Sequence, residues 1–285
     1  MRSTSFALVI GLTLAVACAT HSKSPVATVA PAAASDTIGK FVWHDLISDD
    51  VPAARRFYGE LLGWQFTDVA RRGRPYVMAR LHGQPVGGMV AVEPVSDREV
   101  SQWIGFESVT SVDDAVATFE KSGGHTLVAP VNVESIGRAA LVTDPQGAPV
   151  GLLRLAGADP PDLPSPVEGR FFWMEYLARD PSAAAAFYAG TFGYTREVTD
   201  RLASTEYVVL RRGRPRGGIL QAPRPDMRPA WLPYILVSDP APLVARVRAL
   251  GGTVLLEPRA DVRKSSLAVV TDPSGAMFAL QKYPF

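Results

Sequence analysis

The stretch "FVWHDLISDDVPAARRFYGELLGW" at residues 41–64 decides the fold, because the chain repeats it. At residues 171–194 it reads "FFWMEYLARDPSAAAAFYAGTFGY", with a tryptophan, an aspartate, a Phe-Tyr pair and a glycine at matching places. A second motif behaves alike, since "TDPQGAPVGLL" at 143–153 matches "TDPSGAMFALQ" at 271–281. Self-similarity at a fixed period indicates a repeated structural unit. The sequence therefore predicts a tandem duplication, with domains at 40–156 and 169–285 and a Pro-rich linker at 157–168.

Each copy divides again into two similar units. Trp43 begins a strand-like run, Asp50 stands where a helix N-cap is expected, and Gly63 follows the expected helix end. Three β-type runs come next: "GWQFTDVA", "PYVMARLHG" and "VGGMVAV". The plan repeats from Trp103, with Ser111 as the next helix N-cap. The predicted fold class is α+β, with two βαβββ units in each copy.

Length and charge limit the possible functions. The chain has 285 residues, 47% of them hydrophobic, which is enough for two domains with their own cores. Twenty-nine basic and 28 acidic residues give a net charge of +1. A nearly balanced chain produces no field that would attract a polyanion. We therefore expect no nucleic-acid partner.

The N-terminus is typical of an exported protein. Phe6–Ala17 is an apolar run too short to span a bilayer, and residues 1–18 are predicted to be a signal peptide. Three outcomes remain open: lipid attachment at Cys18, the only cysteine; plain cleavage after Ala17 and secretion; or retention as an uncleaved anchor. Residues 19–39, rich in Ala, Ser, Thr, Val and Pro, are predicted to be a tether. The expected location is the cell envelope, with the lipid as the only membrane contact, or the exterior.

The repeated motifs resemble the vicinal oxygen chelate superfamily, which includes glyoxalase I, bleomycin-resistance proteins, fosfomycin-resistance enzymes and extradiol dioxygenases. The early strand, the Asp-to-Gly helix with its Phe-Tyr pair, and the T-D-P-x-G turn carry the resemblance, which covers residues 40–285. It implies tandem glyoxalase/bleomycin-resistance-type domains, each an incomplete barrel of two βαβββ modules around a cavity. In catalytic members of the family, histidine and glutamate side chains hold a divalent metal in that cavity.

The family's metal positions are occupied here by residues that cannot coordinate a metal. The resemblance places the first-strand ligand fifteen residues before the tyrosine of the Phe-Tyr pair, and the other ligands in the second unit. The aligned residues are Trp43, Trp103 and Gly151 in one copy and Trp173, Trp231 and Ala279 in the other. Indole has a donor N–H and no lone pair for a metal. His44 is one residue out of register and so projects from the opposite face. We expect no metal cofactor; a divalent metal at a displaced site is the alternative.

Other residues remain as candidates for function. Strand alternation places Asp45 beside Trp43, and Glu175 beside Trp173. Each carboxylate is interpreted as a recognition group or general base, or as a group satisfied by backbone N–H or arginine. His44 is the third catalytic candidate, although packing is its expected role. The predicted ligand-binding set is Trp43, Asp45, Trp103, Phe106, Trp173, Glu175, Trp231 and Tyr234.

Three hypotheses of function follow. The first is a metal-free binding protein for a small aromatic or amphipathic molecule. The second is an enzyme of the glyoxalase, dioxygenase or isomerase type with a displaced metal or carboxylate acid–base groups. The third is a structural or interaction protein whose aromatic residues fill the cavities. The duplication could supply within one chain the interface that relatives build by dimerising, so we expect a monomer.

Overall fold

The structure is a computed structural model, and it describes residues 37–71, 74–93, 101–202 and 205–283. The predicted signal peptide, the lipidation at Cys18 and most of the predicted tether lie outside the described residues and stay predictions. The last tether residues belong to the folded part, because Thr37 Oγ1 donates to Asp159 Oδ2 at 2.7 Å and Gly39 N donates to Ser108 O at 2.8 Å. No helix in the described part is both long and apolar enough to cross a membrane.

Two sheets of eight strands organise the chain. In the first sheet the order is β2-β3-β4-β1-β5-β8-β7-β6, and in the second it is β10-β11-β12-β9-β13-β16-β15-β14. The first sheet contains β1 (Phe41–Ser48), β2 (Gln65–Arg71), β3 (Arg74–Leu81), β4 (Gln84–Ala91), β5 (Gln102–Ser108), β6 (His125–Val133), β7 (Gly137–Thr143) and β8 (Pro149–Leu155). The second contains β9 (Phe171–Ala178), β10 (Thr195–Leu202), β11 (Thr205–Arg212), β12 (Arg214–Gln221), β13 (Ala230–Leu236), β14 (Thr253–Leu256), β15 (Leu267–Thr271) and β16 (Met277–Gln281).

The identical strand orders confirm the predicted duplication and the α+β fold of four βαβββ units. Within each sheet the two units meet at their first strands, where β1 runs antiparallel to β5 and β9 runs antiparallel to β13. Each first strand also pairs in parallel with the last strand of its own unit, as β1 does with β4. Neither sheet closes into a barrel, since β2 and β6 are the two edges of the first sheet.

The helices are α1 (Val51–Leu62), α2 (Val112–Lys121), α3 (Pro181–Phe192) and α4 (Ala241–Ala249). The start of α1 is fixed by Asp50, whose side chain accepts from Ala53 N at 2.9 Å, with Pro52 in the first turn. It ends at Gly63, which takes a left-handed φ of 73° that glycine adopts without strain. In the second copy, α3 has the same start at Asp180 and the same end at Gly193.

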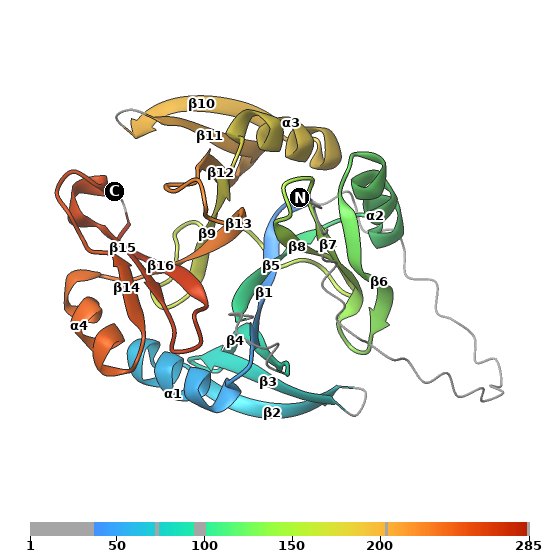
Figure 1. Ribbon diagram of the computed structural model, residues 1–285. Helices are drawn as coiled ribbons and strands as arrows, with labels where there is room; N and C mark the ends of the chain where they lie inside the picture. The colour runs from blue at the N-terminus through green and yellow to red at the C-terminus, as the bar shows by residue number, and fades with distance from the viewer. Residues whose placement is uncertain (1–36, 72–73, 94–100, 203–204, 284–285) are drawn as a thin grey trace, which may run out of the picture.

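The two hydrophobic cores on the helix side each contain residues from both copies. Figure 1 shows α1 beside α4 and α2 beside α3, so the first unit adjoins the fourth and the second adjoins the third. One core joins Phe57 and Tyr58 of α1 to Val247 of α4 and Phe278 of β16. The other core includes Phe119, Tyr188 and Phe192. Because each core is completed by the other copy, neither copy has a closed core of its own on this side.

A buried chain of hydrogen bonds also crosses between the copies. Trp103 Nε1 donates to the Tyr58 hydroxyl at 2.8 Å, and that hydroxyl donates to Asp272 Oδ2 at 3.2 Å. Asp272 belongs to the T-D-P-x-G turn of the other copy, which it stabilises by accepting from Ala276 N at 3.0 Å. An equivalent row of hydrogen bonds runs the other way between the copies, from Trp231 through Tyr188 to Asp144. The motifs that carry the family resemblance therefore meet across the two copies.

Candidate functional site

The helix-free face of the first sheet, called the first face below, carries a cluster around Asp45. Trp43 and Asp45 are both partly exposed and project from the same side of β1. Trp43 Nε1 donates to Asp45 Oδ1 at 2.7 Å, and the Tyr76 hydroxyl of β3 donates to the same oxygen at 2.6 Å. The indole and the carboxylate therefore lie on one side of the strand, as period-two alternation predicts. Two donors hold the carboxylate in one orientation.

Gly88 makes room for this cluster. A Cβ atom at Gly88 would lie 1.7 Å from the Tyr76 hydroxyl and 2.4 Å from Asp45 Oδ1, so no side chain fits there. The second copy has the same arrangement, because a Cβ at Gly218 would lie 2.0 Å from the Tyr207 hydroxyl. Glycine at this point of the fourth strand lets the tyrosine lie across the sheet and reach the first strand.

Phe106 continues the first face on β5. It stands directly opposite Trp43 in the antiparallel register and is partly exposed. On its other side it faces Gly151 of β8, where a Cβ would lie 2.2 Å from the phenyl ring. The position aligned with the family's glutamate ligand is therefore covered by an aromatic ring. The first face is a partly exposed carboxylate set among three aromatic side chains.

The equivalent face of the second sheet, called the second face, is closed by an ion pair. Glu175 of β9 is only 3% exposed, and its Oε1 lies 2.5 Å from Arg263 Nη2. The Tyr234 hydroxyl donates to Glu175 Oε2, and Trp173 Nε1 donates to the Tyr207 hydroxyl at 3.1 Å. Burial, followed by the charge of Glu175, raises the pKa of Tyr234 well above its usual value, so this hydroxyl stays protonated.

Arg263 is placed over the second face by an unusual turn. Arg263, Lys264 and Ser265 have φ values of 46°, 53° and 64°, in the left-handed region that side chains other than glycine rarely adopt. The guanidinium lies 5.3 Å from the centre of the Tyr234 ring and also donates to Gln281 Oε1 at 3.1 Å. With ring, carboxylate and amide around it, Arg263 fills the second face.

The prediction for Trp103 and Trp231 as ligand-binding residues is corrected by their placement. Trp103 stands opposite Leu46 in the strand register, so it projects to the helix side with the core and not to the first face. Trp103 and Trp231 are each 4% exposed, and their N–H groups donate to buried tyrosines. The error arose because Trp103 and Phe106 are three residues apart and thus lie on opposite sides of a strand.

His44 lies on the helix side, as its register predicts. It is 7% exposed, and its ring stacks on Phe171 with centres 4.0 Å apart. Burial lowers the pKa of His44 to about 3, so the imidazole is neutral at physiological pH. The histidine is therefore separated from Asp45 by the sheet itself. His82 and His125 are exposed, in a hairpin turn and at the start of β6.

The donor atoms of the two faces do not fit the family's metal. At the aligned position on β1, the Trp43 N–H already donates to Asp45, and Gly151 and Ala279 have no donor atom in their side chains. No group of three His, Cys, Asp or Glu side chains suited to a metal occurs among the described residues. The expectation of a metal-free protein stays a prediction, because it concerns the purified protein.

Three residues of these faces were missed in the sequence. Tyr76 and Tyr207 occupy matching places on the third strand of each copy and bond to the Trp43–Asp45 and Trp173–Glu175 pairs. Their repeated position was a usable signal. Arg263 had no such signal, since its role depends on the left-handed turn.

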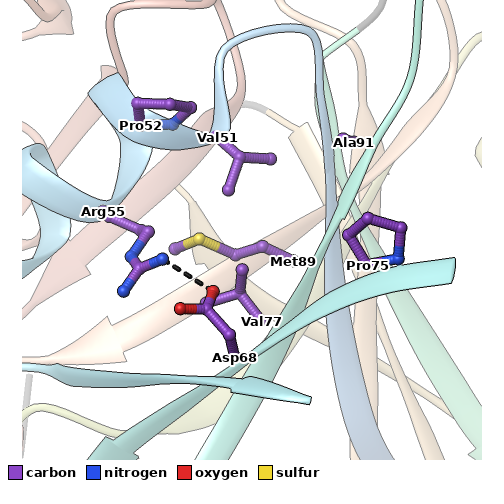
Figure 2. A pocket seen from close by; sticks show the side chains of 8 residues that line it. All are labelled: Val51, Pro52, Arg55, Asp68, Pro75, Val77, Met89 and Ala91. Carbon is purple, nitrogen blue, oxygen red and sulfur yellow. Dashed lines mark hydrogen bonds and ion pairs between the residues drawn. The ribbon is translucent and has the colours of Figure 1, made fainter. Parts of the chain in front are cut away.

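A hollow on the helix side of the first unit carries no chemistry of its own. It lies between α1 and strands β2 to β4 and measures about 450 Å³ (Figure 2). Its walls are mostly apolar, with Val51, Val77 and Met89 among them. The charged pair at its edge, Arg55 and Asp68, is satisfied internally at 2.8 Å. Surface pairs of this kind contribute little to stability.

Comparisons with known proteins agree with this architecture. A family model described as "Glyoxalase/Bleomycin resistance protein/Dioxygenase superfamily" matches residues 37–152, and one described as a glyoxalase-like domain matches 173–281. The chain is 32% identical over 244 residues to "Putative glyoxylase CFP32" of Mycobacterium tuberculosis, covering 84% of this chain and 93% of that one. It is 29% identical over 259 residues to the anthracycline biosynthesis protein DauV of Streptomyces sp. strain C5, covering 85% and 92%.

Two solved structures are also similar. The Mn(II)-bound glyoxalase from Novosphingobium aromaticivorans has a TM-score of 0.57 at 14% identity, covering 86% of this chain and 82% of that one. A variant of homoprotocatechuate 2,3-dioxygenase from B. fuscum has a TM-score of 0.57 at 15% identity, covering 86% and 71%. At such identities these two structures speak for the fold alone.

Proposed function

Because the chain belongs to the glyoxalase/bleomycin resistance/dioxygenase superfamily, we propose that it uses the first face to bind a small aromatic molecule bearing hydroxyl or ammonium groups. The chain is related to enzymes of the glyoxalase and dioxygenase type, yet its two faces lack their metal-binding side chains. The scaffold is the same, while the aligned ligand positions hold tryptophan, glycine or alanine, none of which coordinates a metal through its side chain. Such a face is suited to recognition.

The observation that carries this proposal is the contrast in exposure between the two carboxylates. Asp45 is partly exposed between Trp43, Tyr76 and Phe106, whereas Glu175 is buried under an arginine. A fixed carboxylate accepts hydrogen bonds from hydroxyl or ammonium donors, and hydrogen bonds to charged groups contribute about 1.5–3 kcal/mol. Aromatic walls stack on planar ligands and attract cations.

The second candidate function is an enzyme in which Asp45 is a general base. The family to which the chain belongs and the relative named as a putative glyoxylase favour it. The Asp45 carboxylate, held by Trp43 and Tyr76, could take a proton from an acidic C–H or O–H group of a substrate bound on the first face. Both functions predict that binding requires Asp45. Only the enzymatic function predicts that the bound compound is chemically converted during incubation with the protein.

The test uses daunorubicin, a soluble anthracycline chosen because relatives are named for anthracycline biosynthesis. We expect saturable quenching of tryptophan fluorescence with one site per chain, and about tenfold weaker binding in Asp45→Asn. The aglycone, which keeps the hydroxylated rings and lacks the ammonium, separates the two kinds of donor. Chromatography of the recovered compound reports whether it has been converted.

Two controls make the result specific. Asp114→Asn removes an exposed carboxylate from the first turn of α2 and should leave the affinity within twofold. Elemental mass spectrometry of untagged protein should give well under one transition metal per chain. Equal binding by wild type and Asp45→Asn, or about one metal per chain lost with Asp45, would remove the basis of the proposal.

A further inference from the structure

A cavity of about 580 Å³ lies between the two copies, beneath the linker. Its walls come from the first strands β1 and β9, and linker residues between Pro160 and Val167 cover it. This volume falls in the range of small-molecule sites, roughly 300–1,000 Å³. The cavity shares Trp43 with the first face, but it differs from that site because it involves both copies and its wall includes His44 from the opposite side of β1.

The lining residues come largely in matched pairs from the two copies. Phe41 matches Phe171, Trp43 matches Trp173, and Pro85 matches Pro215. At two positions the copies differ in polarity. His44 stands where the second copy has Met174, and Arg216 stands where the first copy has Val86.

These two differences are informative because the fold accepts an apolar residue at each place. Burial of a polar side chain costs free energy unless that side chain gains a hydrogen-bond partner. Met174 and Val86 show that packing at these two positions does not require a polar side chain. His44 Nε2 is buried and has no hydrogen-bond partner among the described residues. Both polar residues line the same cavity. A ligand with a polar group would explain why they are there.

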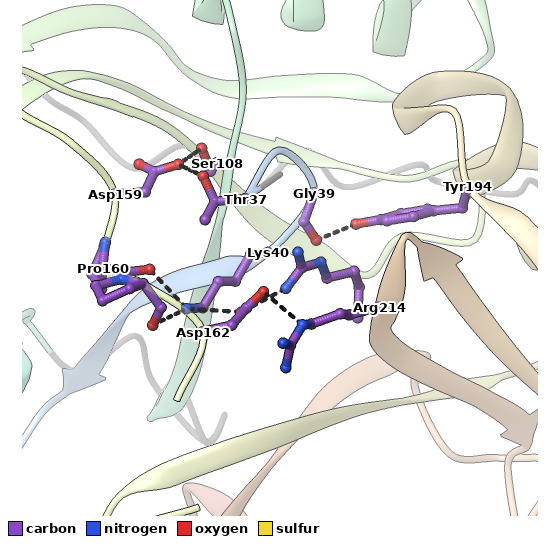
Figure 3. A network of polar contacts seen from close by, with 11 residues as sticks. Thr37, Gly39, Lys40, Ser108, Asp159, Pro160, Asp162, Tyr194 and Arg214 are labelled. Carbon is purple, nitrogen blue, oxygen red and sulfur yellow. Dashed lines mark hydrogen bonds and ion pairs between the residues drawn. The ribbon is translucent and has the colours of Figure 1, made fainter. Parts of the chain in front are cut away.

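Positive charge gathers at one end of the cavity. Arg216 Nη1 lies 2.8 Å and Lys40 Nζ 3.2 Å from Asp162 Oδ1 of the linker, and Arg214 Nε lies 3.7 Å from Asp162 Oδ2 (Figure 3). Three cations thus surround one carboxylate. Burial alone would raise the pKa of Asp162, but hydrogen bonds from Arg216 and Lys40 outweigh this and lower it, so the carboxylate is charged.

We propose that this cavity binds a small aromatic anion, a carboxylate or sulfonate, whose charged group lies on Arg216 and Lys40 where Asp162 now lies. Its ring packs between Phe41 and Phe171, and His44 offers its free ring nitrogen to a polar substituent. The carboxylate of Asp162 is then a competitor carried by the linker itself. Ligand entry exchanges one carboxylate for another anion without leaving the arginine unpaired.

The experiment titrates the full chain with 8-anilinonaphthalene-1-sulfonate and follows its emission. The matched neutral probe is N-phenyl-1-naphthylamine, which has the same ring system without the sulfonate. We expect one saturable site per chain for the sulfonate. Arg216→Val, which installs the residue of the matched position, should weaken sulfonate binding at least tenfold and neutral-probe binding less than twofold.

A second variant should act in the opposite direction. Asp162→Asn removes the competing carboxylate and should strengthen sulfonate binding by threefold or more. A merely structural ion cluster would not produce a gain. Circular dichroism and thermal unfolding report whether Arg216→Val folds. If it does not, Asp162→Asn and the charge-retaining Arg216→Lys replace it as the test. Arg216→Lys should keep most of the affinity for the sulfonate.

Control variants separate this site from the first face. Arg154→Val removes an exposed arginine from β8 and should change sulfonate binding less than twofold, as should Asp45→Asn. The proposal is overturned if Arg154→Val and Arg216→Val weaken binding equally, if Asp162→Asn weakens it, or if both probes lose affinity alike. Loss of sulfonate binding in Asp45→Asn would assign the probe to the first face instead.

Discussion

The first and second faces are built from the same strand positions and reach opposite outcomes. On the first face a partly exposed Asp45 accepts from Trp43 and Tyr76. On the second, Glu175 has one more methylene, is buried, and meets Arg263 and a tyrosine hydroxyl. The residue spacing that relates the two T-D-P-x-G turns also makes Phe106 of the first copy equivalent to Tyr234 of the second, and Ser135 equivalent to Arg263.

Three small changes therefore convert an accessible carboxylate into a closed ion pair. A methylene, a hydroxyl and a guanidinium are enough, because the tyrosine and glycine that support the first-strand residues are the same in both sheets. The difference teaches that the fold does not determine which face is open. Side chains at three positions determine it, while the surrounding strands keep their register.

Separating the two copies is expected to have the largest effect on stability. Each helix-side core is completed by the other copy, so residues 37–156 or 157–285 expressed alone would expose half of two cores. We expect neither fragment to show a cooperative thermal transition, and mixing them to restore one in part. A fragment that unfolds cooperatively as a monomer would contradict the shared-core description.

Opening the second face is the next largest effect. Arg263→Ser installs the residue of the first copy, which already adopts a φ of 60° at Ser135. Because it leaves Glu175 buried without its cation, we expect the free energy of unfolding to fall by about 3–5 kcal/mol. Denaturant unfolding measures this, and Arg211→Ser, in an exposed pair with Glu197, should cost about 0–1 kcal/mol. Equal losses would mean that the second face is not specially stabilised.

The buried aspartates of the two T-D-P-x-G turns predict an effect of pH. Burial raises the pKa of Asp272 from 3.8 to about 6, although hydrogen bonds from Ala276 N, Ser274 N and Tyr58 oppose the shift. Between these values the unfolded chain loses this proton while the folded chain keeps it, so stability falls as pH rises from about 4 to 6, by up to about 3 kcal/mol. Burial raises the pKa of Asp144 too, with the same sign.

The Asp272→Asn variant isolates this contribution, because asparagine resembles the protonated side chain. Urea unfolding of wild type and variant at intervals between pH 4 and 7 should show that the variant gains on the wild type as pH rises. Parallel curves would mean that Asp272 titrates in the folded protein as it does in the unfolded chain.

The smallest effect on stability is expected on the first face. Asp45 is partly exposed and accepts hydrogen bonds from Trp43 and Tyr76 that an asparagine oxygen can also accept, so Asp45→Asn should change the free energy of unfolding by less than about 1 kcal/mol. The matched change Glu175→Gln should cost several times more, since it leaves Arg263 buried beside a neutral amide. A large loss for Asp45→Asn would show that both faces are structural.

The fold was predictable because its signals are local and occur twice. Asp50 and Asp180 begin the first helix of each copy, and Gly63 and Gly193 end it, so both helices could be located from the sequence. The side of β1 from which Asp45 and His44 project followed from period-two alternation, and the structure agrees.

The composition of the site was less predictable. Trp103 was predicted to share a face with Phe106, but the two residues are three apart on one strand and therefore project from opposite sides of the sheet. The Arg263–Glu175 pair joins residues far apart in sequence. It depends on a left-handed turn at residues 263–265 that contains no glycine and so has no signal in the sequence. Long-range pairs of this kind depend on how the sheet brings its edges together, which local pattern does not specify.

The linker has one more consequence, which concerns concentration. Two chains that shared cores as these copies do would separate on dilution, whereas a covalent connection keeps the partner at an effective concentration on the order of millimolar. Association then no longer depends on how much protein the cell makes. Nor must both partners carry the same sequence, as they would in a symmetric dimer. Covalent fusion thus permits the unlike residues His44 and Met174, which occupy matching positions in the two copies, to line a single cavity.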